Sequence, residues 1–191
     1  ALADYNKAIE LHPKDNLKYY YLHRERGRLY HYGINQYDKA LADYNKAIEL
    51  EPEDAGNYYW RGRLYRENLN QNDKALADFN KGIELNSEFI GNYNERGLLY
   101  QFLKQYDKAL ADYSKAIELN SEDRGAYYYK ISLYTETKEY EKAIDVIKLT
   151  IEMDPKDPEG YFQLGLIYKV EKKYLKAIIE FTRSIDLLNN N

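Results

Sequence analysis

Residues Ala40 to Leu50 read Ala-Leu-Ala-Asp-Tyr-Asn-Lys-Ala-Ile-Glu-Leu, and the same eleven residues, unchanged, form the N-terminus from Ala1 to Leu11. Such close copies indicate that much of the chain forms a repeated structural scaffold, here called the frame. This repetition favours a binding function over catalysis. Further copies, nearly intact or weaker, begin at Ala75, Ala109, Ala143 and Ala177.

Each copy has the periodicity of an amphipathic helix. Its apolar residues recur at intervals of three and four, with polar residues on the opposite face. Successive copies begin 39, 35, 34, 34 and 34 residues apart. A nearly fixed period in this range indicates stacked helical repeats. In the second copy the apolar positions are Ala40, Leu41, Tyr44, Ala47 and Ile48.

A second recurring stretch precedes each copy and contains a Gly followed three residues later by a Tyr. Gly inside a helix costs about 0.5–1 kcal/mol relative to Ala, so its recurrence needs a reason. We expect a close helix contact there, with Ala40 and Ala47 on the other side. The fourth stretch has Ile131 instead of Gly. The others are Arg26–Tyr30, Arg61–Tyr65, Arg96–Tyr100 and Leu164–Tyr168.

Helix stops are equally regular. Pro13, Pro52 and Pro155 stand just beyond three of the copies, where a helix cannot continue. Asp157 followed by Pro158 predicts an N-cap and a first helical turn. The sequence therefore predicts eleven helices of roughly 12–16 residues, comprising one unpaired helix and five helix pairs.

These features resemble the tetratricopeptide repeat, a helix–turn–helix unit of about 34 residues. The resemblance implies an all-α, right-handed superhelical solenoid of antiparallel helix pairs. It also implies that the first helix of each pair lines a concave groove that holds a peptide or helical segment of another protein. The matching residues are Tyr58, Gly62, Tyr65, Ala75 and Phe79, then Tyr161, Leu164, Gly165, Tyr168, Ala177 and Phe181.

We predict one solenoid domain with an unpaired second helix, residues 1–12, followed by five repeats. The first repeat is five residues longer than the family length. Four of these precede His23, so we expect its first helix to begin one turn early. The fifth falls near Gly33, and the second repeat has a similar addition. The predicted repeats are residues 13–51, 52–86, 87–120, 121–154 and 155–191.

Composition excludes several functions. The net charge of −4 gives no general attraction to nucleic acid, and no apolar run is long enough to span a membrane. There is no cysteine, and the three histidines lack metal-ligand spacing. We therefore expect a soluble, cytoplasmic non-enzyme without cofactor or metal. The chain opens inside a helical pattern without Met, so we expect a fragment of a longer protein.

The repeats supply an internal comparison. Tyr30 recurs at one place in every repeat, and Arg26 recurs in the first three. We interpret both as frame, with Arg26 pairing with Asp43. Places that vary are available to a partner. The resemblance puts the groove-facing places three residues before, one after and four after each Gly position. They are Arg24, Arg28, His31, Tyr59, Arg63, Arg66, Asn94, Leu98, Gln101, Tyr128, Ser132, Thr135, Phe162, Leu166 and Lys169, with Trp60 beside them.

Four of these residues are arginines in the first two repeats. Arg binds carboxylate or phosphate in a bidentate manner, which favours an acidic or phosphorylated ligand there and a more apolar portion toward the C-terminus. The alternative is a solvated basic strip neutralised by Glu25, Glu67 and Glu95. His23 takes an aromatic position of the family, so we expect it to pack rather than react.

Two other functions stay open. RNA-binding helical repeats have similar lengths, although the negative charge argues against that reading. Self-association is the other, because the chain begins and ends on second helices that lack a neighbour. The last of these presents Ile178, Phe181, Ile185, Leu187 and Leu188.

Overall fold

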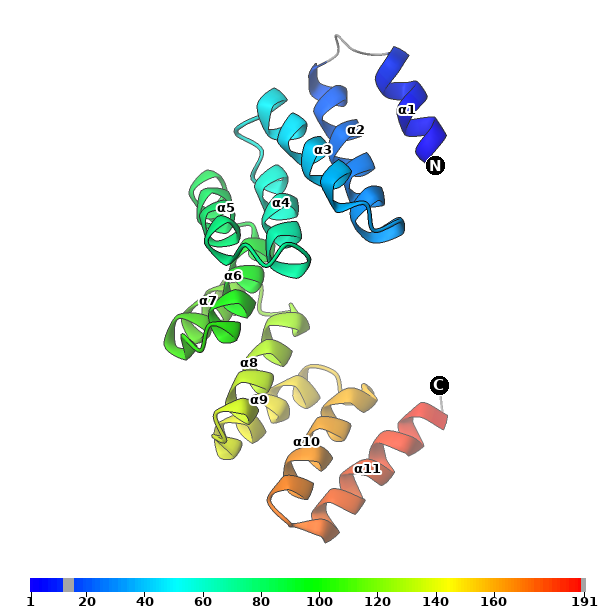
Figure 1. Ribbon diagram of the computed structural model, residues 1–191. Coiled ribbons are helices and arrows are strands. Elements are labelled where there is room, and N and C mark those ends of the chain that lie inside the picture. The colour runs from blue at the N-terminus through cyan, green and yellow to red at the C-terminus, as the bar shows by residue number, and fades with distance from the viewer. Residues whose placement is uncertain (12–15, 190–191) are drawn as a thin grey trace. The chain divides into compact units, whose positions relative to one another are not determined.

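The computed structural model describes residues 1–11 and 16–189 and contains eleven α-helices and no strand over that part of the chain (Figure 1). The helices form two compact units, Ala1–Leu103 and Lys104–Asn191, here called the N-terminal and C-terminal units. The N-terminal unit contains α1 (Leu2–Leu11), α2 (Asn16–Arg28), the π-helical turn η1 (Leu29–Gly33), α3 (Tyr37–Leu50), α4 (Ala55–Glu67), α5 (Asn72–Leu85) and α6 (Ile90–Phe102). The C-terminal unit contains α7 (Tyr106–Leu119), α8 (Arg124–Glu136), α9 (Tyr140–Met153), α10 (Pro158–Val170) and α11 (Tyr174–Asn189).

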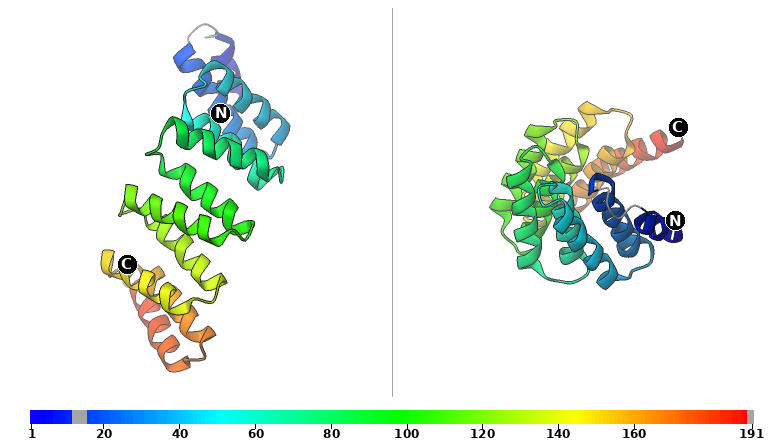
Figure 2. Two further views of the ribbon diagram at one scale, coloured as in Figure 1. Left: turned by 90° about the vertical axis from the view of Figure 1, so that its left-hand side faces the viewer. Right: turned by 90° about the horizontal axis from the view of Figure 1, so that it is seen from above.

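Successive helices pack as antiparallel pairs, which confirms the predicted fold class. In the N-terminal unit α2 pairs with α3 and α4 with α5; in the C-terminal unit α8 pairs with α9 and α10 with α11 (Figures 1 and 2). We call α2, α4, α6, α8 and α10 first helices and the others second helices. Asp157 caps α10 as predicted, because its side chain accepts a hydrogen bond from the Glu159 amide and Pro158 opens the helix.

The recurring Tyr residues pack between helices, as predicted. Tyr30 and Tyr65 are buried in the N-terminal unit, and Tyr134 and Tyr168 pack against one buried cluster in the C-terminal unit. A lysine from the second helix lies over each of these rings, 5.4–5.6 Å from its centroid. The recurrence therefore reflects packing.

The recurring Gly meets an aromatic ring, not the small Ala residues that the sequence suggested. A Cβ on Gly62 would lie 2.7 Å from the Phe79 ring, and one on Gly165 would lie 2.6 Å from the Phe181 ring. The ring from the second helix lies against the first helix where the Gly leaves room. The expectation that Ala40 and Ala47 make this contact was therefore wrong. In the pair of α8 and α9, Ile131 of α8 takes the Gly position and Ile147 of α9 takes the aromatic position, and both are buried in one cluster.

The extra residues of the first repeat lie where the sequence placed them. α2 begins eleven residues before Gly27, whereas α4 begins seven residues before Gly62, so α2 starts about one turn early. The other extra residue widens the helix end into η1, where the Ile34 amide donates to the Leu29 carbonyl. The predicted boundary at residues 12 and 13 lies outside the described residues.

The recurring Arg and Asp residues form a frame of ion pairs. Arg26 binds both oxygens of Asp43 at 2.7 and 2.8 Å, and Arg61 binds Asp78 in the same way at 2.7 and 2.9 Å. Each guanidinium also donates to an Asn of the preceding second helix, Asn6 or Asn45. The prediction that these arginines belong to the frame is confirmed at both positions.

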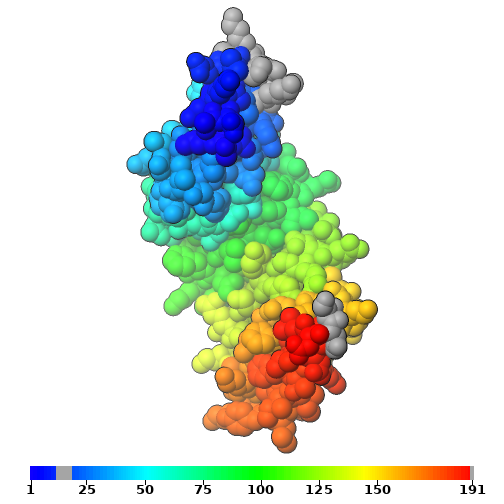
Figure 3. Space-filling model, turned by 90° about the vertical axis from the view of Figure 1, so that its right-hand side faces the viewer, coloured from blue at the N-terminus to red at the C-terminus, as the bar shows by residue number. Residues whose placement is uncertain are grey.

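The second helix at the C-terminal end of the described chain leaves apolar side chains exposed. α11 is the red helix on the surface of the C-terminal unit in Figure 3. Ile178, Ile185 and Leu188 are exposed, as predicted, while Phe181 and Leu187 are half-buried. Leu175, which the sequence analysis did not single out, is 79% exposed.

Candidate functional site

Arg24 ties two first helices together. Its Nη1 donates to Asp54 at 2.7 Å and to Asn57 at 3.2 Å, and the side chain is largely covered. Asp54 in turn caps α4 by accepting from the Gly56 amide at 2.7 Å. The predicted ligand-facing Arg24 therefore performs a structural role at the start of α4.

Arg28 and Trp60 form the centre of an aromatic cluster on the first helices of the N-terminal unit. The Arg28 guanidinium lies 4.1 Å from the centroid of the Trp60 ring, within stacking distance. Tyr59 packs edge-on against Trp60 at 4.9 Å, and Tyr32 does so at 6.1 Å. We call Arg28, Tyr32, Tyr59, Trp60 and Arg63 the aromatic–arginine cluster.

Arg28 retains the most solvent access of the four predicted arginines. Its side chain is 41% exposed, and its Nη1 donates to Glu25, one helical turn earlier, at 2.7 Å. The Glu25 side chain is only 14% exposed, so the pair is partly buried. Of the four arginines, Arg28 therefore has the most side-chain surface available to a ligand.

Arg63 and Arg66 are held in a network with two carboxylates. Arg63 contacts Glu67 at 2.8 Å and Glu95 at 3.1 Å, and Arg66 contacts Glu95 at 2.6 Å. Burial raises the pKa of Glu95 above its ordinary value, despite the two guanidinium groups. For Arg63, burial works against the charge, but Glu95 and Glu67 outweigh it and raise its pKa. Glu25, Glu67 and Glu95 therefore do pair with the arginines of the first two repeats, as the alternative interpretation expected.

His31 is not on the surface, so its predicted place among the ligand-facing residues was wrong. It is 2% exposed, and its Nε2 lies 2.6 Å from the Asn68 Oδ1. The π-helical turn contains one extra residue and rotates the residues after it around the helix axis, which brings His31 inward and leaves Tyr32 outside. The sequence placed the insertion near Gly33, the last residue of η1, but did not show that His31 would turn inward.

The C-terminal unit has a cavity of about 600 Å³ between α8 and α10. Its lining includes Tyr128, Ser132 and Thr135, three places that the sequence analysis expected to face a ligand. Two carboxylates, Glu136 and Glu159, also line it, and no basic side chain does. The lining therefore combines apolar surface, including Tyr128 and Ile131, with two carboxylates.

Four other predicted residues are outside the lining of this cavity. Asn94 and Leu98 are half-buried on α6, and Leu166 is half-buried on α10. Phe162 is exposed beside Phe181, with ring centroids 5.7 Å apart. Phe89, which the sequence analysis missed, packs against Tyr59 at 5.1 Å. Phe89 lies just before α6, outside the helical periodicity from which the contacts were predicted.

Two further searches bear on function. Among the described residues, no group of three or more His, Asp or Glu side chains is arranged to hold a metal ion. No described helix is both long enough and apolar enough to cross a membrane.

The antiparallel pairs and their recurring frame define the class of α-helical repeat proteins. Family profiles of the tetratricopeptide repeat match residues 55–89, 93–123 and 158–191, and a TPR repeat profile matches residues 27–68. The chain belongs to the tetratricopeptide repeat family.

Solved structures of similar fold have low sequence identity to the chain. A tetratricopeptide repeat protein from Parabacteroides merdae is 24% identical, with 97% of this chain and 72% of that chain covered and a TM-score of 0.78. YrrB, described as a TPR protein with an unusual peptide-binding site, is 24% identical, with coverage of 98% and 93% and a TM-score of 0.67. MamA from Desulfovibrio magneticus is 21% identical, with coverage of 93% and 97% and a TM-score of 0.73.

These identities establish the fold and nothing more specific. A search among curated proteins returned no match to the chain.

Proposed function

We propose that the chain is a non-catalytic scaffold that binds segments of other proteins on its first helices. The observation that carries the proposal is the cavity between α8 and α10. Tyr128, Ser132 and Thr135 line it from positions whose side chains differ from repeat to repeat, while the frame around them recurs. The peptide-binding site named for YrrB adds a precedent on the same fold.

A peptide library selected on the intact chain tests this proposal. Peptides that bind in the cavity lose affinity by about tenfold or more when Tyr128→Ala removes the ring, since aromatic anchors dominate such contacts. Lys115→Ala on α7 is the control, because this lysine occupies a recurring place on a second helix. Equal loss with both variants, or no enriched peptide, would contradict the proposal.

The finer part of the proposal concerns an acidic or phosphorylated ligand near the first two repeats. Arg24, Arg63 and Arg66 already bind internal carboxylates across helices, so an acidic ligand would have to displace those bonds. Arg28 pairs only within its own helix and is the most exposed. We therefore assign the contact with an acidic group to Arg28, next to the Trp60 ring.

Trp60 is the only tryptophan, so its fluorescence reports this contact directly. An Asp/Glu-rich peptide is expected to change the Trp60 emission and to bind more tightly than its Asn/Gln counterpart. Arg28→Gln is expected to abolish that preference with helicity retained. Lys46→Gln removes the same charge from a second helix and is expected to leave it. If the two peptides bind equally to the unmodified chain, the acidic preference is wrong and the scaffold proposal is unaffected.

Self-association is the second candidate function, because α11 exposes Leu175, Ile178 and Leu188. The equivalent of Ile178 in α9 is Ile144, which is buried. Sedimentation velocity over a range of concentrations tests this candidate. Association that Ile178→Lys removes would support it, and a single monomeric species at all concentrations would exclude it.

A further inference from the structure

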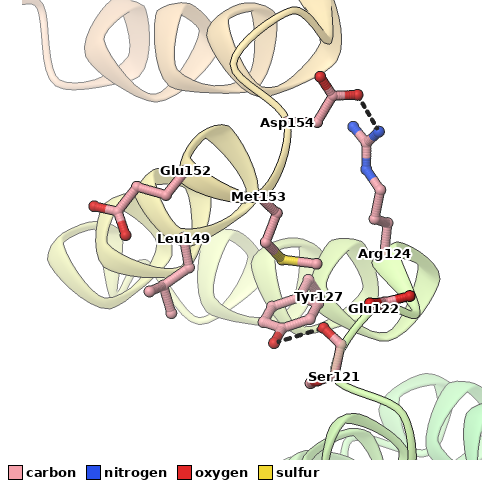
Figure 4. Close-up of a pocket in the computed structure, with 8 residues that line it drawn as sticks. All are labelled: Ser121, Glu122, Arg124, Tyr127, Leu149, Glu152, Met153 and Asp154. Carbon is pink, nitrogen blue, oxygen red and sulfur yellow. Dashed lines mark hydrogen bonds and ion pairs between the residues drawn. The ribbon is translucent and has the colours of Figure 1, made fainter.

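A second hollow, of about 700 Å³, lies in the C-terminal unit at the start of α8 and the end of α9 (Figure 4). It shares no lining residue with the cavity that contains Tyr128. Its walls include Tyr127 from α8 and Leu149 and Met153 from α9. Leu149 is 49% exposed and Met153 is 40% exposed, so apolar surface faces solvent here.

The other second helices show what is unusual about Leu149. At the equivalent place α3, α5 and α7 carry a lysine that pairs with a glutamate three residues later. These pairs, Lys46–Glu49, Lys81–Glu84 and Lys115–Glu118, have N–O distances of 2.6, 2.8 and 2.8 Å. In α9 the glutamate is kept as Glu152, while the lysine is replaced by Leu149.

The exchange does little for the fold. An exposed helical ion pair of this kind contributes only about 0.3–0.5 kcal/mol, and about half of the Leu149 side chain faces solvent, at 49% exposed. What changes is the surface. A neutral Lys–Glu pair becomes an apolar side chain next to a carboxylate without its usual cation.

The charges around the hollow are unbalanced. Arg124 is the only basic side chain in the lining, and it already pairs with Asp154 and Asp157 and donates to the Tyr128 hydroxyl. Glu122 and Glu152 also line the hollow. In the part of the chain that the structure describes, neither of these two carboxylates forms an ion pair. The hollow thus combines an apolar floor with uncompensated negative charge.

We propose that this hollow binds a basic–aliphatic segment of a partner protein. A Lys or Arg side chain lays its aliphatic stem on Leu149, Met153 and Tyr127 and directs its charged end to Glu122 or Glu152. Methionine adapts its shape to such a guest, and the Tyr127 ring face attracts the cation. A volume of about 700 Å³ lies within the ordinary range of ligand sites and leaves room for a short segment. This site is independent of the first-helix surface proposed above.

The experiment uses Met153, the only methionine of the chain, as a reporter inside the hollow. With a ¹³C-labelled methionine methyl group, the intact chain gives one methyl resonance in the NMR spectrum. The probes are three short peptides with alternating Lys and Leu, Glu and Leu, or Lys and Ser. The Lys–Leu peptide is expected to shift the Met153 resonance to saturation, whereas the other two leave it in place.

Two variants make the test specific. Leu149→Lys restores the residue found in α3, α5 and α7, so it keeps the helix and supplies a cation for Glu152. It is expected to weaken binding of the Lys–Leu peptide by about tenfold or more, the equivalent of ~1.4 kcal/mol. Asp145→Asn makes the same change in net charge on α9, outside the hollow, and is expected to leave the affinity unchanged.

Three outcomes would overturn the proposal. One is a Met153 resonance that the Lys–Leu peptide does not move. Another is an equal response to the Glu–Leu peptide, which would mean apolar contact without charge selection. The third is unchanged binding of the Lys–Leu peptide to the Leu149→Lys variant. Thermal unfolding of that variant shows separately that it is folded.

Discussion

At the scale of single residues, a side chain's neighbours decide whether its charge is available. Arg63 and Arg28 both stack near Trp60 and look equivalent in the sequence. Arg63, however, binds Glu67 on its own helix and Glu95 on the next first helix, whereas Arg28 binds only Glu25 on its own. Arg63 is therefore part of the frame, and Arg28 is the arginine to which we assign the contact with a ligand.

His31 gives a prediction at the same scale. Burial lowers its pKa below the ordinary 6.5, although Asn68 and Glu67 act to raise it. As the pH falls through about 6.5, the unfolded chain binds a proton at this residue and the folded chain does not. The folded state therefore loses stability toward acid pH through His31.

We expect the free energy of unfolding to fall from about pH 7.5 to about pH 5.5 more steeply in the unmodified chain than in His31→Gln. The other histidines and the carboxylates are common to both proteins and cancel in the comparison. Urea unfolding at each pH supplies the two curves. If the free energy of unfolding changes with pH in parallel for the two proteins, burial does not lower the pKa of His31 and the prediction is wrong.

At the scale of helices, one contact defines each pair. Where the first helix has Gly, the second helix has an aromatic ring over it, as in Gly62 with Phe79. Where the first helix has Ile131, the second helix has Ile147. In the fourth pair, two branched side chains, one from each helix, fill the space that one ring fills elsewhere. This compensation explains why the fourth pair can lack the recurring Gly.

The compensation can be transferred to α4 and α5. Gly62→Ile alone pushes a branched side chain into the Phe79 ring and is expected to cost about 1–3 kcal/mol of stability. Phe79→Ile alone removes buried volume and is also destabilising. The double variant copies the pair of Ile131 and Ile147. We therefore expect its loss of unfolding free energy to be smaller than the sum of the losses in the two single variants. Chemical denaturation of the four proteins completes the cycle, and additive costs would contradict the volume argument.

The helix ends show how far the sequence could predict the elements. Periodicity and the proline stops predicted all eleven α-helices, because both depend on local chemistry. The length of the first repeat even predicted the early start of α2. The π-helical form of η1 could not be read, because an extra residue can widen a helix or lengthen a loop at similar cost. His31 and Tyr32 exchanged places for that reason.

At the scale of the whole chain, the repeats separate the frame from the surface. The Arg–Asp pairs and the recurring Tyr residues were predictable, because each repeat reports the same contact again. The partner of Arg24 was not, because Asp54 lies 30 residues away and this pair does not recur. Residues outside the repetition, to which we assign the binding specificity, leave no repeated signal in the sequence.

The central claim is that protein segments bind to the places that vary between repeats, on the first helices, while the recurring places serve folding. The most direct test scores every single substitution in the intact chain for two properties, abundance of folded protein and binding of a library-selected peptide. We predict that substitutions at Trp60 and Tyr128 reduce binding with folding retained, and that substitutions at Asp43 and Asp78 reduce folding. Some substitutions will reduce binding without reducing the abundance of folded protein. The claim is contradicted if these substitutions concentrate at recurring second-helix positions such as Lys46, Lys81 and Lys115.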